Sequence, residues 1–338
     1  VSLIKNNKKN ERTRGRSLAL NTCEEQGAAL IFVLFLVILL AVIVGELAYT
    51  GRMAFRMAEN HRDNLISGYA SVSGFNYGKY LLLKDLDPGE DDDSGDVNVD
   101  GLSDDWAEPA APRTVGNTAV SLEIIDGESG LNINKIGNMK NVQLRNLFSE
   151  LVKAFGGTAD DVRLIFQHWN PGNKANDTED KLFFPEELKQ IEGLSKELRG
   201  SDIFKSLSCN SNGMININTA PKELLRLMLT EKTDLTDFMD TRKEEPYRSV
   251  AAVKKHFQKA AGFRSDYFQV QVKANVNKRN FTKIYTYFVH RNRKNKNISR
   301  LYTRETYEEG VISVAEEPGM EGYGNPLSGS RPHTPFSD

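Results

Sequence analysis

Residues 28–44 read AALIFVLFLVILLAVIV, a run of seventeen residues without a polar side chain. An α-helix rises about 1.5 Å per residue, so about twenty residues cross the roughly 30 Å hydrocarbon core of a bilayer. Gly45, Leu47 and Ala48 extend the run past Glu46 to that length. A buried helix of a soluble core normally carries a polar stripe, and this run has none. The run therefore predicts a membrane-spanning helix.

The residues before this run carry a positive charge that predicts the orientation of the chain. Six bases and three acids precede it, a net charge of +3: Lys5, Lys8, Lys9, Arg12, Arg14 and Arg16 against Glu11, Glu24 and Glu25. Basic flanks stay in the cytoplasm, so we expect a periplasmic body and an inner-membrane, single-pass protein. A cleaved secretory signal peptide is the alternative. Its apolar region is normally about 7–15 residues, and no good small-x-small cleavage site follows this run.

The composition of the chain excludes several classes of protein. The formal net charge is −2, so the bulk charge does not indicate nucleic-acid binding. Cys23 and Cys209 are the only cysteines. Two thiols do not make a disulfide-rich scaffold or a zinc site with paired cysteines.

The junction between the charged leader and the apolar run is more specific. Residues 24–30 read EEQGAAL, so the leader ends in Gly27 and the apolar helix begins at Ala28. This junction resembles the cleavage site of type IV pilin-like proteins, in which a membrane peptidase cuts after the glycine and the helix is retained. A plain anchor that follows a glycine is the alternative.

One position departs from the pilin-like pattern. Those proteins usually carry a glutamate at the fifth position after the cut, and here that residue is Phe32. A carboxylate at the bilayer centre costs about 2.5–3.5 kcal/mol on insertion scales and is tolerated when it pairs. In the pilin family it pairs with the free amine of a neighbouring subunit. A subunit with Phe32 fits best at an end of a filament.

The helical pattern continues beyond the membrane to about Lys84. Small and apolar residues recur at steps of three, four or seven, with charged residues on other faces. We expect this stripe to face the core of the body and to serve packing rather than ligand binding. Its members are Leu47, Gly51, Ala54, Ala58, Leu65, Tyr69, Val72 and Tyr80.

An acidic loop follows, with eleven acids and no bases in residues 85–108. Within it, Asp96, Asn98, Asp100 and Asp104 surround Gly101 in a pattern that resembles the first half of a calcium loop. Position twelve of such a loop would be Ala107, and the nearest glutamate comes one residue late. These four residues are the candidate calcium ligands, and a solvated acidic loop without a metal is the alternative.

The body reads as an antiparallel sheet interrupted by helices, which is an α+β arrangement. Alternating patterns predict strands, and 3.6-residue periodicity predicts helices between them. Thr219 is predicted to cap a helix and Pro221 to lie in its first turn. The predicted strands are residues 120–125, 131–133, 267–274 and 281–289, with a hairpin connection at 277–280; the predicted helices are residues 142–155, 159–167, 185–191, 221–229 and 249–257.

The order of these pieces resembles the large minor pseudopilin of type II secretion systems, the general secretion pathway protein K family. Two parts match less well: residues 167–170 read QHWN where relatives tend to have an aspartate-rich helix end, and the tail after Val314 reads as disordered. The matching pieces are Gly27-Ala28 with Phe32, then residues 45–48, 102–107, 126–134 (DGESGLNIN), 184–188 with 191–193, 215–221 and 266–268.

The resemblance implies a pilin-like long helix, transmembrane at its start, packed on an antiparallel sheet, with a large inserted SAM-like helical domain. It implies a complex with two other minor pseudopilins at the tip of a periplasmic fibre that helps export folded proteins. Further implied partners are the major pseudopilin, the prepilin peptidase, the inner-membrane assembly platform and membrane lipid. The family's sheet domain contains calcium. The implied segments are residues 1–27 (leader), 28–48 (membrane), 49–84 (periplasmic helix), 85–135 (loop and first strands), 136–264 (helical insertion), 265–314 (last strands) and 315–338 (tail).

Three other functions fit the sequence less well. A minor pilin of a type IV pilus or competence fibre shares the cleavage site and the helix, but the helical insertion favours the secretion protein. Residues 217–224 resemble the entry of a helix-hairpin-helix DNA-binding repeat, yet the following residues 230–234 lack the glycine that such a hairpin needs. The five histidines are scattered and no catalytic motif appears, so we expect neither an enzyme nor a catalytic cofactor.

Overall fold

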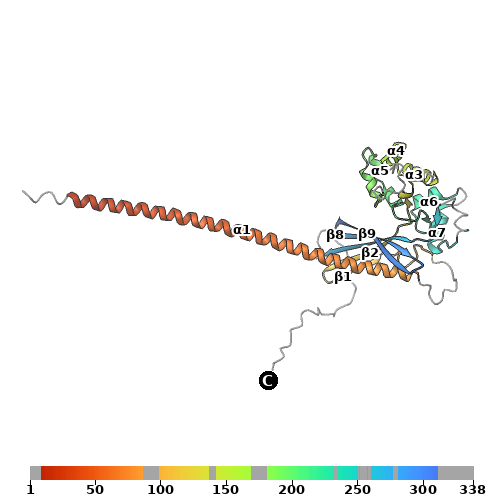
Figure 1. Ribbon diagram of the computed structural model, residues 1–338, viewed down its shortest axis with the longest axis horizontal. Helices are drawn as coiled ribbons and strands as arrows, with labels where there is room; N and C mark the ends of the chain where they lie inside the picture. The colour runs from red at the N-terminus through yellow and green to blue at the C-terminus, as the bar shows by residue number, and fades with distance from the viewer. Residues whose placement is uncertain are drawn as a thin grey trace, which may run out of the picture. The chain divides into compact units, whose positions relative to one another are not determined.

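The computed structural model describes residues 9–86, 99–136, 142–168, 181–230, 234–249, 251, 257, 260–276 and 281–310 (Figure 1). The chain divides into two units, residues 1–65 and residues 66–338, and each is described by itself.

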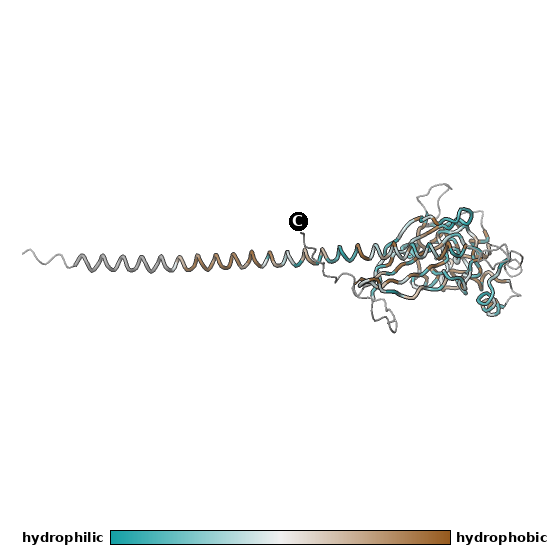
Figure 2. Tube along the Cα trace, turned by 90° about the horizontal axis from the view of Figure 1, so that it is seen from below, coloured by the Kyte–Doolittle hydropathy of each residue, from teal (hydrophilic) through white to brown (hydrophobic). Residues whose placement is uncertain are grey.

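Helix α1 runs from Lys9 to Lys84. All described residues of the first unit belong to this helix. From Gly27 onward it is long and apolar enough to cross a membrane, by length and composition. Its side chains from Leu30 to Val44 are exposed, and Figure 2 shows them as a continuous hydrophobic stretch. The predicted end at Lys84 is confirmed, whereas the helix begins upstream of the predicted Ala28.

The second unit is built on a five-stranded antiparallel sheet with the strand order β1-β2-β7-β8-β9. Strands predicted from alternation are confirmed in β2, β7 and β8, and each is longer than expected. The outer strands β1 and β9 were not predicted, and the connection at 277–280 lies outside the described residues. The bounds are β1 Ala110–Val115, β2 Thr118–Asp126, β7 Tyr267–Val276, β8 Phe281–Asn292 and β9 Asn297–Glu309.

The end of α1 packs on one face of this sheet through its smallest residues. Ser67 and Ser71 are buried, and the Ser71 hydroxyl lies 2.8 Å from the hydroxyl of Tyr287. A Cβ atom at Gly78 would lie 2.7 Å from Cγ1 of Val270, so the helix backbone and the sheet are in direct contact there. Leu82 then enters a core formed by Trp106 of the preceding loop and by apolar side chains of the sheet.

The predicted core-facing stripe is therefore wrong. Leu47, Leu65, Tyr69, Val72 and Tyr80 are all exposed large hydrophobic residues. The prediction assumed that the larger apolar side chains face the core, as in most surface helices. Here serine and glycine occupy the closest points of approach to the sheet, Phe75 packs on Tyr287 beside them, and the predicted large side chains are exposed.

Between β2 and β7 the chain forms a helical insertion with its own hydrophobic core. Figure 1 shows α3 to α7 grouped together. Two short parallel pairs close the insertion: β3 (Leu131–Asn132) with β4 (Leu207–Ser208), and β5 (Ile215–Asn216) with β6 (Ala261–Gly262). The helices are α2 Ile133–Ile136, α3 Val142–Ala154, α4 Ala159–His168, η2 Pro185–Gln190, α5 Lys196–Gly200, η3 Asp202–Ser206, α6 Lys222–Met228 and α7 Leu235–Glu244.

Most predicted helices of the insertion are confirmed, with local differences. The helices at 142–155, 159–167 and 221–229 correspond to α3, α4 and α6, while 185–191 forms the 3-10 helix η2. Most of 249–257 lies outside the described residues. The predicted strand at 131–133 pairs over two residues only, because α2 begins at Ile133.

The predicted helix cap at Thr219 is wrong. Pro221 occupies the N-cap position of α6, and the first helical residue is Lys222. The Thr219 hydroxyl donates instead to Oδ2 of the buried Asp126, a carboxylate on β2. The threonine thus ties the start of α6 to the sheet, which is a contact that local sequence does not reveal.

The predicted fold class is confirmed: a long N-terminal helix packs on an antiparallel sheet and further helices are inserted between the strands.

Candidate functional site

The predicted cleavage junction lies within α1. Gly27 and Ala28 are helical and exposed, and the Phe32 side chain is exposed one turn further on. A Cβ atom at Gly27 would meet no other part of the described chain. The junction is thus free of packing contacts in the structure, and cleavage after Gly27 stays a prediction.

Two of the four candidate calcium ligands come together, with a third carboxylate that the sequence did not indicate. Oxygen atoms of Asp85, Asp100 and Asp104 lie within 4.8 Å of one another. Asp96 and Asn98 lie outside the described residues. The Asp104 carboxylate accepts hydrogen bonds from the Gly101 amide at 2.8 Å and the indole of Trp106 at 3.0 Å. The signal for Asp85 was weak, since it lies fifteen residues before Asp100.

Two arginines of the β8–β9 region already balance part of the negative charge of this acidic cluster. Arg291 is fully buried and donates to Oδ1 of Asp100 and, at 2.7 Å, to Oδ2 of Asp85. Arg293 donates to the other oxygen of Asp100. Burial still raises the pKa of Asp85 to about 7, because lost hydration outweighs the attraction of Arg291. Burial raises the pKa of Asp104 as well.

The donor atoms of the cluster are carboxylate oxygens, and calcium takes oxygen ligands, usually six to eight of them. The three described carboxylates supply part of such a set. Arg291 competes for oxygens of Asp85 and Asp100. Calcium binding by Asp96, Asn98, Asp100 and Asp104 therefore stays a proposal, with Asp85 as an added candidate.

A second buried acidic group joins the sheet to the helical insertion. Asp126 ends β2, and its Oδ2 accepts hydrogen bonds from the Ser265 hydroxyl at 2.6 Å and the Asn216 amide at 3.0 Å. Glu128 is completely buried and accepts from the backbone amides of Asn212 and Asp266 at 2.8 and 2.9 Å. Burial raises the pKa of Asp126 to about 6 and that of Glu128 to about 7. Asp126 and Glu128 thus form a structural junction that joins the sheet to the helical insertion.

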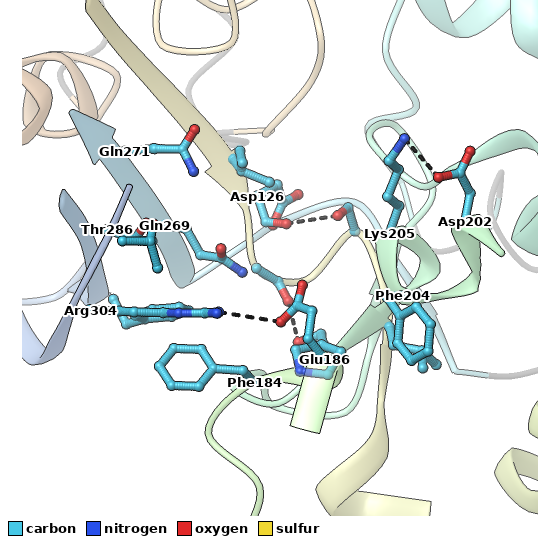
Figure 3. Close-up of a pocket in the computed structure, with 18 of the residues that line it drawn as sticks. Asp126, Phe184, Glu186, Asp202, Phe204, Lys205, Gln269, Gln271, Thr286 and Arg304 are labelled. Atoms are coloured by element: carbon cyan, nitrogen blue, oxygen red, sulfur yellow. Dashed lines mark hydrogen bonds and ion pairs between the residues drawn. The ribbon is translucent and has the colours of Figure 1, made fainter. Parts of the chain in front are cut away.

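A cleft of about 450 Å³ lies beside this junction, between the sheet face opposite α1 and the insertion (Figure 3). Two ion pairs line it, Arg304 with Glu186 at 3.5 Å and Lys205 with Asp202 at 3.0 Å, while Lys189 lies over the ring of Phe204. Arg304 also lies over the ring of Phe184, 4.3 Å from its centroid. The Arg304–Glu186 pair joins the sheet wall of the cleft to the wall formed by the insertion.

No protein-family model matches the sequence, and no curated protein matches it either. The fold is similar to one chain of the crystal structure of the GspK–GspI–GspJ complex from the type 2 secretion system of enterotoxigenic Escherichia coli. The TM-score is 0.53 at 13% sequence identity, over 74% of this chain and 99% of that chain. The resemblance to a GspK-like pseudopilin that the sequence indicated is confirmed at the level of the fold.

Proposed function

We propose that the chain is a minor pseudopilin at the tip of a type II secretion pseudopilus and works by assembly rather than by catalysis. The observation that carries this proposal is the architecture: an apolar helix of membrane-spanning length continues onto an antiparallel sheet with a helical insertion. The same fold occurs in a complex of secretion-system proteins named GspK, GspI and GspJ. Proteins of that kind are the proposed partners, together with the major pseudopilin and the assembly platform.

Phe32 supports a position at the tip. A subunit inside a pilin-like filament offers a carboxylate to the free amine of its neighbour, and a phenylalanine offers none. A terminal subunit has no neighbour on one side that needs this partner. The apolar residue also avoids the cost of a buried charge in the bilayer.

The proposed topology places the basic leader in the cytoplasm and the body in the periplasm, with the prepilin peptidase cutting after Gly27. Mass spectrometry of the membrane-extracted protein tests this directly. We expect a mature chain that starts at Ala28 with a methylated amine. A start near Leu47, or a chain that retains the leader, would contradict the proposed processing.

Co-purification tests the proposed role. The full-length chain, extracted in mild detergent from cells that also express the minor pseudopilins encoded beside it, should recover those proteins. Deletion of the gene should abolish export of the system's folded substrates. Normal export with loss of surface pili would instead support the alternative, a minor pilin of a type IV pilus or competence fibre.

We also propose that calcium binds at the acidic cluster. Support comes from the closeness of Asp85, Asp100 and Asp104 and from their all-oxygen donor set. The ion would neutralise the carboxylates beyond what Arg291 and Arg293 provide and would fix the loop against the sheet.

A further inference from the structure

The cleft beside the Asp126 junction contains hydrogen-bonding side chains that the fold itself does not use. Its floor is the outer face of the sheet, where Gln269, Gln271 and Thr286 lie beside one another (Figure 3). Thr286 is only 7% exposed, yet its side chain makes no hydrogen bond to any described residue. The side-chain amides of the half-buried Gln269 and Gln271 make none to the described residues either. A ligand in the cleft would therefore meet three polar side chains with unused donors and acceptors.

The register of the sheet places these groups in an ordered array. Gln271 lies opposite Thr286, and Thr286 lies opposite Arg304 on β9. Directly opposite residues have Cβ atoms about 4.5–5.5 Å apart, so three hydrogen-bonding side chains follow one another across the strands. Gln269 lies two residues along β7 from Gln271 and therefore on the same face. Donors and acceptors are thus held at fixed spacing along two directions of the cleft floor.

The insertion forms the opposite wall of the cleft. Phe184 and Glu186 reach it from the start of η2, and Asp202 and Lys205 reach it from η3 (Figure 3). Phe184 and Phe288 add apolar surface next to the polar array. The volume of about 450 Å³ lies within the range of small-ligand sites, which is about 300–1,000 Å³.

The charges of the lining favour a neutral ligand over an anion. A site that recognises phosphate or a carboxylate normally gathers cations around it. In this cleft the formal charges of the lining sum to zero, three acids against three bases: Asp126, Glu186 and Asp202 against Lys189, Lys205 and Arg304.

The backbone of the floor separates a saccharide from a peptide. Strand β7 lies between β2 and β8, and β8 lies between β7 and β9, so the backbone groups of both strands already bond to their neighbours. A peptide that binds to a sheet adds to a free strand edge, and the strands that carry Gln269, Gln271 and Thr286 have none. The hydroxyl groups of a saccharide both donate and accept hydrogen bonds, and so do the amide and hydroxyl side chains of the floor.

We propose that the cleft binds a short neutral saccharide. Gln269, Gln271 and Thr286 bind its hydroxyl groups, and the rings of Phe184 and Phe288 contact its carbon-bound hydrogens. The site is separate from the acidic cluster and does not depend on the proposed assembly function, so either proposal can fail without the other.

Saturation-transfer NMR on the full-length chain tests the proposal, in a detergent without a sugar head group. The probes are tri-N-acetylchitotriose and maltotriose, which are neutral saccharides with and without acetamido groups, and tetra-alanine as a peptide. We expect at least one saccharide to bind and the peptide not to bind. Binding of the peptide, or of neither saccharide, overturns the proposal.

Variants locate the site. The double change Gln271→Leu with Thr286→Val removes hydrogen-bonding groups and keeps side chains of similar shape. Thr303→Val makes the same change as Thr286→Val at an exposed residue of β9 that does not line the cleft. We expect the double variant to bind the saccharide at least about tenfold more weakly and the control to match the wild type. Equal affinities of all three proteins overturn the site.

Hydrogen exchange of the wild type gives a second readout that does not depend on how a variant folds. The bound saccharide should slow amide exchange in residues 184–190 and 201–206, which contain the wall of the cleft. Exchange in α3, which does not line the cleft, should stay unchanged. Protection confined to segments outside the cleft overturns the proposal.

Discussion

A Cβ atom on Gly78 of α1 would lie 2.7 Å from Cγ1 of Val270 on β7, closer than non-bonded carbon atoms allow. The glycine thus sets how near the helix and the sheet can come. Ser67, Ser71 and Gly74 continue the same narrow side of the helix. Close approach also brings the Ser71 and Tyr287 hydroxyls within hydrogen-bond distance.

Replacement of Gly78 by leucine should destabilise the second unit. The new side chain has no space against Val270, and such overpacking costs about 1–3 kcal/mol. Gly68→Leu is the matched control, because a Cβ at Gly68 meets no other atom nearby. That change should be neutral or slightly stabilising, since glycine is a poor helix former. Thermal unfolding followed by fluorescence of the buried Trp106 measures both, and equal effects would contradict this packing account.

Loss of the Arg291 side chain should cost more. Arg291→Met removes the buried cation that pairs with Asp85 and leaves Asp100 with Arg293 alone, and removal of one partner of a buried pair costs about 3–5 kcal/mol. Lys205→Met breaks an exposed pair with Asp202 and should change stability by about 0.5 kcal/mol or less. The free energies of unfolding in urea test this difference. A cost for Arg291→Met as small as that for Lys205→Met would show that the buried pair does not hold the loop to β8.

Calcium should raise the melting temperature of the chain if the acidic cluster binds it. A ligand at about a hundred times its dissociation constant stabilises the folded state by about 2.7 kcal/mol. Asp104→Asn should remove the effect. Asp105→Asn should not, because Asp105 is exposed and pairs with Lys84 at 2.7 Å. An unchanged melting temperature on addition of calcium or of a chelator would count against the site.

The stability of the folded chain should fall as the pH rises from about 4.5 to about 7. Burial raises the pKa of Glu128 to about 7 from its ordinary 4.5, so the folded state binds a proton that the unfolded chain has released. Protonation of Glu128 contributes on the order of 3 kcal/mol to the free energy of unfolding. This contribution is full below pH 4.5 and is lost as the pH passes 7. Asp126 acts in the same direction, with a pKa of about 6.

Glu128→Gln isolates this contribution, because the amide does not titrate. Urea unfolding across this pH range should show a shallower pH dependence for Glu128→Gln, while Glu150→Gln on the exposed side of α3 should keep the wild-type slope. The slope is the quantity to compare, since the new amide also changes the hydrogen bonds from Asn212 and Asp266. An unchanged slope in Glu128→Gln would place the titration elsewhere.

Local sequence was sufficient for those elements whose pattern is set by neighbours along the chain. The apolar run at 28–44, the end of α1 at Lys84 and the alternation in β2, β7 and β8 are of this kind. Strand β9 was missed because it lies at the sheet edge, where most side chains are exposed and no strict apolar alternation is required. Strand β1 was missed for the same reason, because it lies at the other edge of the sheet.

The candidate sites depended more on tertiary structure. The acidic loop was visible in the sequence, but the fold alone brings Asp85 within 4.8 Å of Asp100 and Asp104. The two arginines that compensate them come from almost two hundred residues further on. Thr219 likewise does not cap α6, because its hydroxyl donates a hydrogen bond to Asp126, more than ninety residues earlier in the chain.

The sequence by itself determined that this chain has a membrane-length helix and an α+β body, because periodicity and composition are local properties; cleavage after Gly27 stays a prediction. Only the tertiary structure decided which side of α1 is buried. Burial depends on how closely two backbones approach, and Gly74 and Gly78 let the sheet come near to one side of the helix, where Phe75 packs on Tyr287. The larger side chains Tyr69 and Tyr80 are thereby left exposed on the other side.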